Sequence, residues 1–261
     1  MSERAPQLAV RLAIRLAIRL APILPVVVAG LGVLAVGCAD VGATRLQIPM
    51  MVEGTAPSPL RVADYDVQVE EARIAFGPLY LCTSRLPDVD ICPAAIAENL
   101  TTTSFDALRE EPTGAGTLQG FTQVSRSAMW DYGRSWRIAD VRPHASPAAV
   151  DGAHSAVLVV AATHAGETRH FRFVLDVDGG SQPSGTTAVR ARLTEQALTP
   201  EVREVRVRFD PTLWASMVDY DTLWDLPVSD VIAVPSGPPA ENALRLAMVL
   251  NGLPTFRWIS P

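Results

Sequence analysis

Residues 130–136 hold the densest set of side chains that could bind a ligand. The alternating large or charged residues of this stretch are Trp130, Tyr132, Arg134 and Trp136. An extended strand would place all of them on one face, where aromatic rings and a guanidinium can stack against sugar rings or a partner protein. The alternative is the edge of a hydrophobic core, with Trp130 buried and its neighbours Tyr132 and Arg134 more exposed.

No local motif supplies the groups of a familiar catalytic mechanism. Residues 179–183 read Gly-Gly-Ser-Gln-Pro, which lacks the spacing of a serine-hydrolase nucleophile turn. Neither a His-Glu-x-x-His zinc motif nor a dinucleotide-binding glycine pattern occurs. His164 and His170 are expected on opposite faces of one hairpin, so they cannot share a metal ion. We expect no metal and no cofactor, and we favour a role that is not enzymatic.

The N-terminus has the composition of an export signal. Residues 1–20 contain four arginines and one glutamate, and residues 21–37 carry no charge. A basic segment, an apolar segment and small residues at the end are typical of a cleaved signal peptide. The apolar run contains two prolines and is shorter than the ~20 residues of a spanning helix, which argues against a permanent anchor.

The segment Ala35-Val36-Gly37-Cys38 resembles the lipobox of bacterial lipoproteins. The resemblance implies that Cys38 receives a diacylglyceryl group and becomes the N-terminus after cleavage. Ala39 follows it instead of an aspartate, and in this family that favours the outer membrane within the bacterial cell envelope. Two alternatives stay open: an ordinary signal peptide that leaves Cys38 free, and a transit peptide, which the arginine repeat of residues 11–19 would also fit.

Once Cys38 is assigned to the lipid, Cys82 and Cys92 remain as a pair. An export compartment is oxidising, so we predict a disulfide between them. Closing so short a loop would stabilise the fold by about 2–3 kcal/mol. A metal-binding pair is the rival, but the spacing, without a nearby histidine, fits no usual zinc site.

The mature chain is predicted to be acidic. The whole sequence has 22 basic and 28 acidic residues, and removing residues 1–37 leaves 18 and 27, a net charge of −9. This charge argues against a nucleic-acid partner and predicts repulsion from anionic lipid surfaces. We therefore expect membrane contact through the N-terminal lipid only, with an envelope protein or a glycan as a candidate partner.

The folded part is predicted to be all-β, a mainly antiparallel sandwich or barrel-like fold with a few short helices. Three regions are expected: a signal peptide (1–37), a lipidated N-terminus with a flexible tether (38–63), and a single β-rich domain (64–261). Alternating apolar residues predict strands over 65–76, with a bulge at Glu70-Glu71, and over 202–209.

The clearest predicted hairpin spans residues 155–178, with Gly166-Glu167 as its two-residue turn. That register pairs Val160 with Phe173 and places both on the core face. Short helices are predicted over 93–99, 210–218 and 239–250.

These patterns together predict an exported envelope lipoprotein with a binding or structural role. The alternative is an exported hydrolase that acts on envelope polymers or glycans, with a site assembled across the fold. A deep cleft with two close carboxylates, or with serine and histidine, would favour the hydrolase. A shallow aromatic patch would favour binding.

Overall fold

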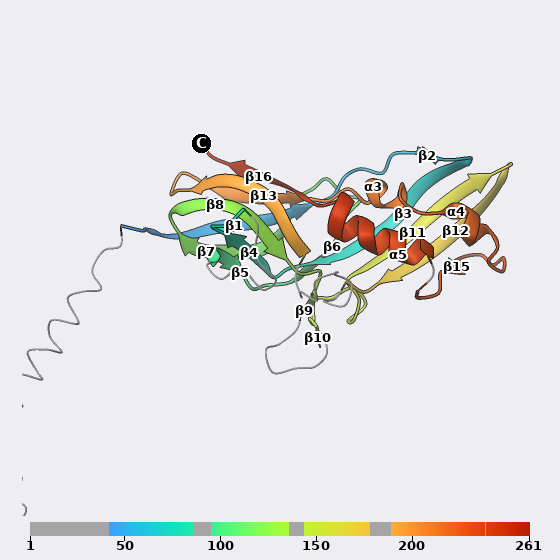
Figure 1. Cartoon of the computed structure of the whole chain (residues 1–261), viewed down its shortest axis with the longest axis horizontal. Helices are drawn as coiled ribbons and strands as arrows, with labels where there is room; N and C mark the ends of the chain where they lie inside the picture. The colour runs from blue at the N-terminus through green and yellow to red at the C-terminus, as the bar shows by residue number, and fades with distance from the viewer. Residues whose placement is uncertain (1–41, 86–94, 136–143, 178–188, 238) are drawn as a thin grey trace, which may run out of the picture. The chain divides into compact units, whose positions relative to one another are not determined.

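The computed structural model describes residues 42–85, 95–135, 144–177, 189–237 and 239–261, with side chains from residue 194 in the fourth range. Contacts divide the chain into Met1–Ala43 and Thr44–Pro261, and nearly all described residues belong to the second unit. Strands make up most of that unit and helices are few and short (Figure 1). The predicted all-β class is therefore confirmed.

One sheet of eight strands forms the half of the unit in which the described chain begins and ends (Figure 1). In spatial order its strands are β13 (Val189–Leu198), β8 (Gln123–Trp130), β4 (Leu79–Cys82), β5 (Ala95–Asn99), β7 (Thr113–Phe121), β1 (Arg45–Glu53), β14 (Glu204–Arg208) and β16 (Thr255–Ile259). Neighbours run antiparallel except β1 and β14, which are parallel.

The second sheet carries the helices of the structure. Its strands are β15 (Ile232–Ala233), β12 (Glu167–Leu175), β11 (Ala156–His164), β3 (Tyr65–Phe76) and β2 (Leu60–Val62), and β6 (Thr103–Asp106) also pairs with β3. Against it lie α3 (Pro211–Ala215), α4 (Tyr220–Trp224) and α5 (Pro239–Leu246), the last continuing into the π-helical turn η2 (Ala247–Asn251) (Figure 1). A small ribbon of β9 (Arg134–Ser135) and β10 (His144–Ala145) stands apart.

Strand β3 connects the cores of the two sheets. Val67 and Val69 face inward, and the pairing with β11 then shifts at Glu70, so the even-numbered Ile74 and Phe76 face the same core. The bulge expected at Glu70-Glu71 is confirmed, and it keeps a long strand buried on one face. Phe76 ends among aromatic rings of the other sheet, with its centroid 5.1 Å from that of Phe209.

The interpretation of residues 38–63 as a flexible tether is wrong from Thr44 onward. Leu46, Ile48, Met50 and Val52 alternate inward along β1, which lies between β7 and β14. Pro49 and the prolines that follow obscure this alternation in the sequence. The sheet accommodates Pro49 through a shift in register between Pro49 and Met51, because proline cannot donate to a ladder hydrogen bond.

The helix predicted over 93–99 is also wrong where the structure describes it. Residues 95–99 form β5, which pairs with β4 and β7, and Ile96, Ala97 and Asn99 are buried. The alanines and glutamate of this segment have a helical preference of only tenths of a kcal/mol per residue, which burial within a sheet overrides.

The predicted hairpin is correct in its core face and wrong in its register. His164 pairs with Glu167, so Ala165 and Gly166 form the turn, with φ of 50° and 84°. Positive φ at both central residues is the geometry of a type I′ turn, which matches the twist of the strands. Val160 therefore pairs with Phe171. Because the shift is by two residues, every core side chain stays on its predicted face.

Two predicted helix boundaries are confirmed. Asp210 caps α3 by accepting a hydrogen bond from the Thr212 backbone N–H, and Pro211 occupies the first turn. The segment of α5 and η2 ends at Gly252, whose N–H donates to the Ala247 carbonyl. The first helix ends sooner than residue 218, since α3 stops at Ala215.

Candidate functional site

The aromatic residues 130 and 132 belong to the core. Trp130 and Tyr132 are both fully buried, with ring centroids 6.5 Å apart, and the Tyr132 hydroxyl donates to the Met248 carbonyl at 3.0 Å. The burial predicted for Trp130 is confirmed, and the exposure predicted for Tyr132 is wrong. Tyr132 is buried because η2 covers this end of β8, and the local sequence around Tyr132 gives no sign of that contact.

The Arg134 side chain is mostly buried and bonds to neighbouring protein groups. Its side chain is 17% exposed, Nη1 donates to the Ala153 carbonyl at 2.6 Å, and the same nitrogen lies 3.6 Å from the Asp176 carboxylate. Asp176 also contacts His154 Nδ1 at 3.0 Å. Trp136 lies outside the described residues. Since Trp130 and Tyr132 are in the core, the four residues do not form the predicted surface platform.

Asp131, which lies between the two core aromatics in the sequence, is itself buried. Its Oδ1 has no hydrogen-bond partner in the described structure, and burial raises the pKa of this carboxyl well above its ordinary value. The neutral form is therefore favoured inside the fold.

The strongest candidate site is a cluster at the far end of the second sheet, which we call the hairpin-end cluster. It consists of Tyr65 from β3, His164 from β11, Arg169 from β12, and Asp221 and Trp224 from α4. The Tyr65 and His164 rings stack with centroids 4.8 Å apart. The Trp224 ring lies 5.2 Å from Tyr65 and meets His164 edge-on at 5.8 Å.

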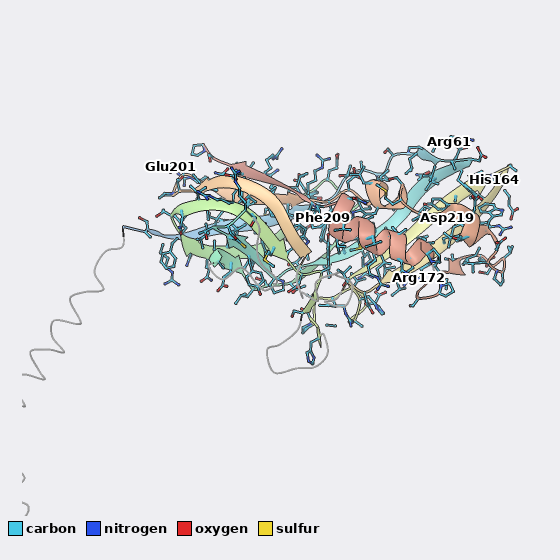
Figure 2. The ribbon with its side chains drawn as sticks, viewed as in Figure 1. Arg61, His164, Arg172, Glu201, Phe209 and Asp219 are labelled. Atoms are coloured by element: carbon cyan, nitrogen blue, oxygen red, sulfur yellow. The ribbon has the colours of Figure 1, made fainter. Side chains whose placement is uncertain are left out.

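Strand pairing and a capped helix bring these residues together. The β3–β11 ladder pairs Asp66 with Thr163, so Tyr65 at the start of one strand meets His164 at the end of the other. Asp219 caps α4 by accepting the Asp221 N–H and fixes the helix over this end. Figure 2 shows His164 and Asp219 at the same end of the described unit, with Glu201 at the opposite end.

Hydrogen bonds fix the polar groups of the cluster. The Tyr65 hydroxyl donates to Asp221 Oδ1 at 2.8 Å. Burial first, and then Asp221, raise the pKa of Tyr65 to about 12, so the phenol stays a neutral donor at physiological pH. His164 Nδ1 lies 3.4 Å from the Asp64 carbonyl, and its Nε2 has no partner among the described residues.

Arg169 stabilises one face of the tryptophan. Its guanidinium carbon lies 4.4 Å from the centroid of the Trp224 ring, a cation–π contact. Nη1 donates to the Trp224 carbonyl at 2.6 Å and Nε donates to Glu167 at 2.7 Å. The arginine is thus held by three interactions and orients the indole ring.

The arrangement favours non-covalent binding of a ring-shaped, hydroxyl-rich ligand. His164 and Trp224 are partly exposed, so their rings can contact a ligand, while Tyr65 is buried beneath them. The exposed Asp221 offers carboxylate oxygens that accept hydrogen bonds beside these rings. Within the described ranges no three residues of the His, Cys, Asp and Glu types are placed to hold a metal ion.

Two hollows on the described surface lie elsewhere. One, of about 420 Å³, is lined by Glu98, Asn99, Leu100, Thr101, Gly116, Thr117 and Gln119. The other, of about 250 Å³, is lined by Glu70, Glu71, Arg73, Ser104, Phe105 and Asp106. Two carboxylates of the second hollow are already engaged, since Glu70 contacts His170 Nδ1 at 2.8 Å and Asp106 accepts the Leu108 N–H.

Sequence reasoning missed the hairpin-end cluster although two signals were present. The sequence already placed His164 and His170 on opposite faces of the hairpin, and the structure confirms this: His164 lies on the face of Phe171, and His170 faces the other way, toward Glu70. Trp224 stands between carboxylates at 219, 221 and 225. The long-range pairing of β3 with β11, together with the packing of α4 against this end, joins these signals.

The cysteine predictions stay predictions. Cys82 is fully buried at the end of β4. Cys38 and Cys92 lie outside the described residues. Across the described ranges, no helix has the length and apolar character needed to cross a bilayer.

Comparison with known proteins gives no family. No family model and no curated protein matches the chain. One solved structure, MbnP from Methylosinus trichosporium, aligns with a TM-score of 0.37 and 11% identity, over 81% of this chain and 90% of that one.

Proposed function

We propose that this chain is a lipoprotein of the bacterial envelope, anchored by lipid at Cys38, whose β-rich unit binds an envelope glycan through the hairpin-end cluster. The observation that carries the binding role is the partly exposed pair His164 and Trp224: His164 stacks on Tyr65, Trp224 packs against the same ring at a tilt, and Asp221 lies beside them. The lipobox-like residues that end at Cys38 support the anchor.

The chemistry of the cluster suits a sugar. Flat rings contact the C–H face of a pyranose, and a neighbouring carboxylate accepts hydrogen bonds from its hydroxyls. Arg169 and the Tyr65 hydroxyl hold Trp224 and Asp221 in place before the ligand arrives, which lowers the entropic cost of binding. Binding is favoured over hydrolysis because the cluster is an aromatic patch, and because Glu70 and Asp106, two of the carboxylates that line the 250 Å³ hollow, already have partners of their own.

The test is co-sedimentation of the purified full-length lipoprotein with envelope polysaccharides, with affinity measured as Kd. His164→Gln and Asp221→Asn should each weaken binding about tenfold, a loss of ~1.4 kcal/mol. His170→Gln is the matched control, because His170 lies on the opposite face of the same hairpin and its solvent-exposed contact with Glu70 contributes little to stability. Equal affinities for all three variants, or no binding by the wild type, would contradict the proposal.

A further inference from the structure

The connection between β7 and β8 exposes two apolar side chains. Phe121 and Val124, which flank it, are 51% and 44% exposed. Single exposed apolar residues are ordinary on a protein surface. These two are distinguished by their position beside the point where the folded unit begins.

Two hydrogen bonds join this connection to the start of the unit. The Thr44 N–H donates to Thr122 Oγ1 at 2.8 Å, and the Thr122 N–H donates to the Thr44 carbonyl at 2.8 Å. The ladder continues with Arg45 opposite Phe121. The exposed turn therefore cannot move away from the N-terminal end of β1.

Chain length then sets how far the turn can lie from the lipid. Six Cα steps separate Cys38 from Thr44, which span at most roughly 20–22 Å when fully extended. The 38–63 tether expected from the sequence would have allowed the domain to move freely above the membrane. Because β1 begins at Arg45, acyl chains on Cys38 would instead keep the turn within that distance of the bilayer surface.

The charges around the turn are compatible with lipid headgroups. Arg45 and Arg126 are exposed, and neither has an ion-pair partner among the described residues. Two exposed acids lie on the neighbouring segment of the chain: Glu195 on β13, which is paired with Arg85, and Glu201 in the connection between β13 and β14, with Arg203 close to it. Arginines next to apolar side chains are the combination that binds anionic headgroups while burying apolar groups beneath them.

We propose that the β7–β8 turn lies in the headgroup region of the leaflet that holds the lipid on Cys38, with Phe121 and Val124 inserted and Arg45 and Arg126 against the phosphates. This rests on the lipid anchor of the proposed function. It replaces the expectation that only the lipid contacts the membrane. It also gives the anchored unit an orientation relative to the membrane. Tyr65 of the hairpin-end cluster begins β3 and lies roughly 35 Å along that strand from Phe76, which packs against the half of the unit that holds the turn.

The test is site-specific photo-crosslinking of the full-length protein in isolated bacterial membranes. A benzophenone amino acid replaces Phe121, and in a control protein it replaces Leu213, which is 50% exposed on α3. Mass spectrometry should find at least about fivefold more phospholipid adduct at position 121 than at 213, because only a side chain at the interface touches lipid. Equal lipid adducts at both positions, or only protein adducts at 121, would overturn the proposal.

The same digest separates failure of this inference from failure of the anchor. The mass of the N-terminal peptide reports whether Cys38 carries acyl chains. An acylated Cys38 without lipid adducts at 121 overturns the membrane-facing turn alone. An unmodified Cys38 overturns the lipid anchor itself, and with it the premise of this inference.

Discussion

Replacing Tyr132 with phenylalanine separates a core role from a binding role for residues 130–136. The Tyr132 hydroxyl is fully buried and donates to the Met248 carbonyl, so its removal leaves that carbonyl without this donor. An unsatisfied buried group costs about 1–3 kcal/mol. In a unit of this size each kcal/mol lowers Tm by roughly 2–4 °C, so a cost of about 2 kcal/mol corresponds to roughly 4–8 °C.

The assay is thermal unfolding of the purified lipoprotein in a non-ionic detergent, followed by circular dichroism. Tyr80→Phe is the matched control, because Tyr80 is only half-buried on β4 and its hydroxyl makes no hydrogen bond within the described residues. Its Tm should stay within about 2 °C of the wild type, since substitutions away from such contacts cost under ~0.5 kcal/mol. An unchanged Tm for Tyr132→Phe together with lost glycan binding would refute the core assignment and restore this stretch as a site.

Two further predictions concern the cysteines and a buried acid. Free-thiol labelling of denatured, unreduced protein should modify neither Cys82 nor Cys92, and full labelling of both would exclude the disulfide. Because burial raises the pKa of Asp131, the native state binds a proton that the unfolded state releases above about pH 4, so stability falls as pH rises toward the folded pKa. Asp131→Asn should therefore unfold at a higher temperature than the wild type at pH 7, and equal values from pH 4 to pH 8 would contradict this sign.

Local patterns were sufficient for much of the β architecture. The alternation along β3, β11, β12 and β14 identified their buried faces, because each strand is half-buried and its side chains repeat every two residues. The N-cap of α3 at Asp210 and the end of the η2 turn at Gly252 could likewise be predicted from neighbouring residues in the sequence. These features need no knowledge of what packs against them.

The errors arose where partners distant in the sequence decide the structure. Pro49 obscures the strand pattern of β1, and the place of β1 in the eight-stranded sheet depends on its pairing with β7 and β14. The hairpin register depends on Ala165 at a φ of 50°, a conformation that a sequence rule assigns to glycine or asparagine. The hairpin-end cluster joins β3, β11, β12 and α4, so no single segment could predict it.

Intact-mass analysis of the mature N-terminus, after purification from bacterial membranes, decides whether the unit is anchored by lipid at Cys38. We predict a chain that begins at Cys38 with a diacylglyceryl group on its sulfur. A mature chain that begins at another residue, or one that carries an unmodified Cys38, would contradict it.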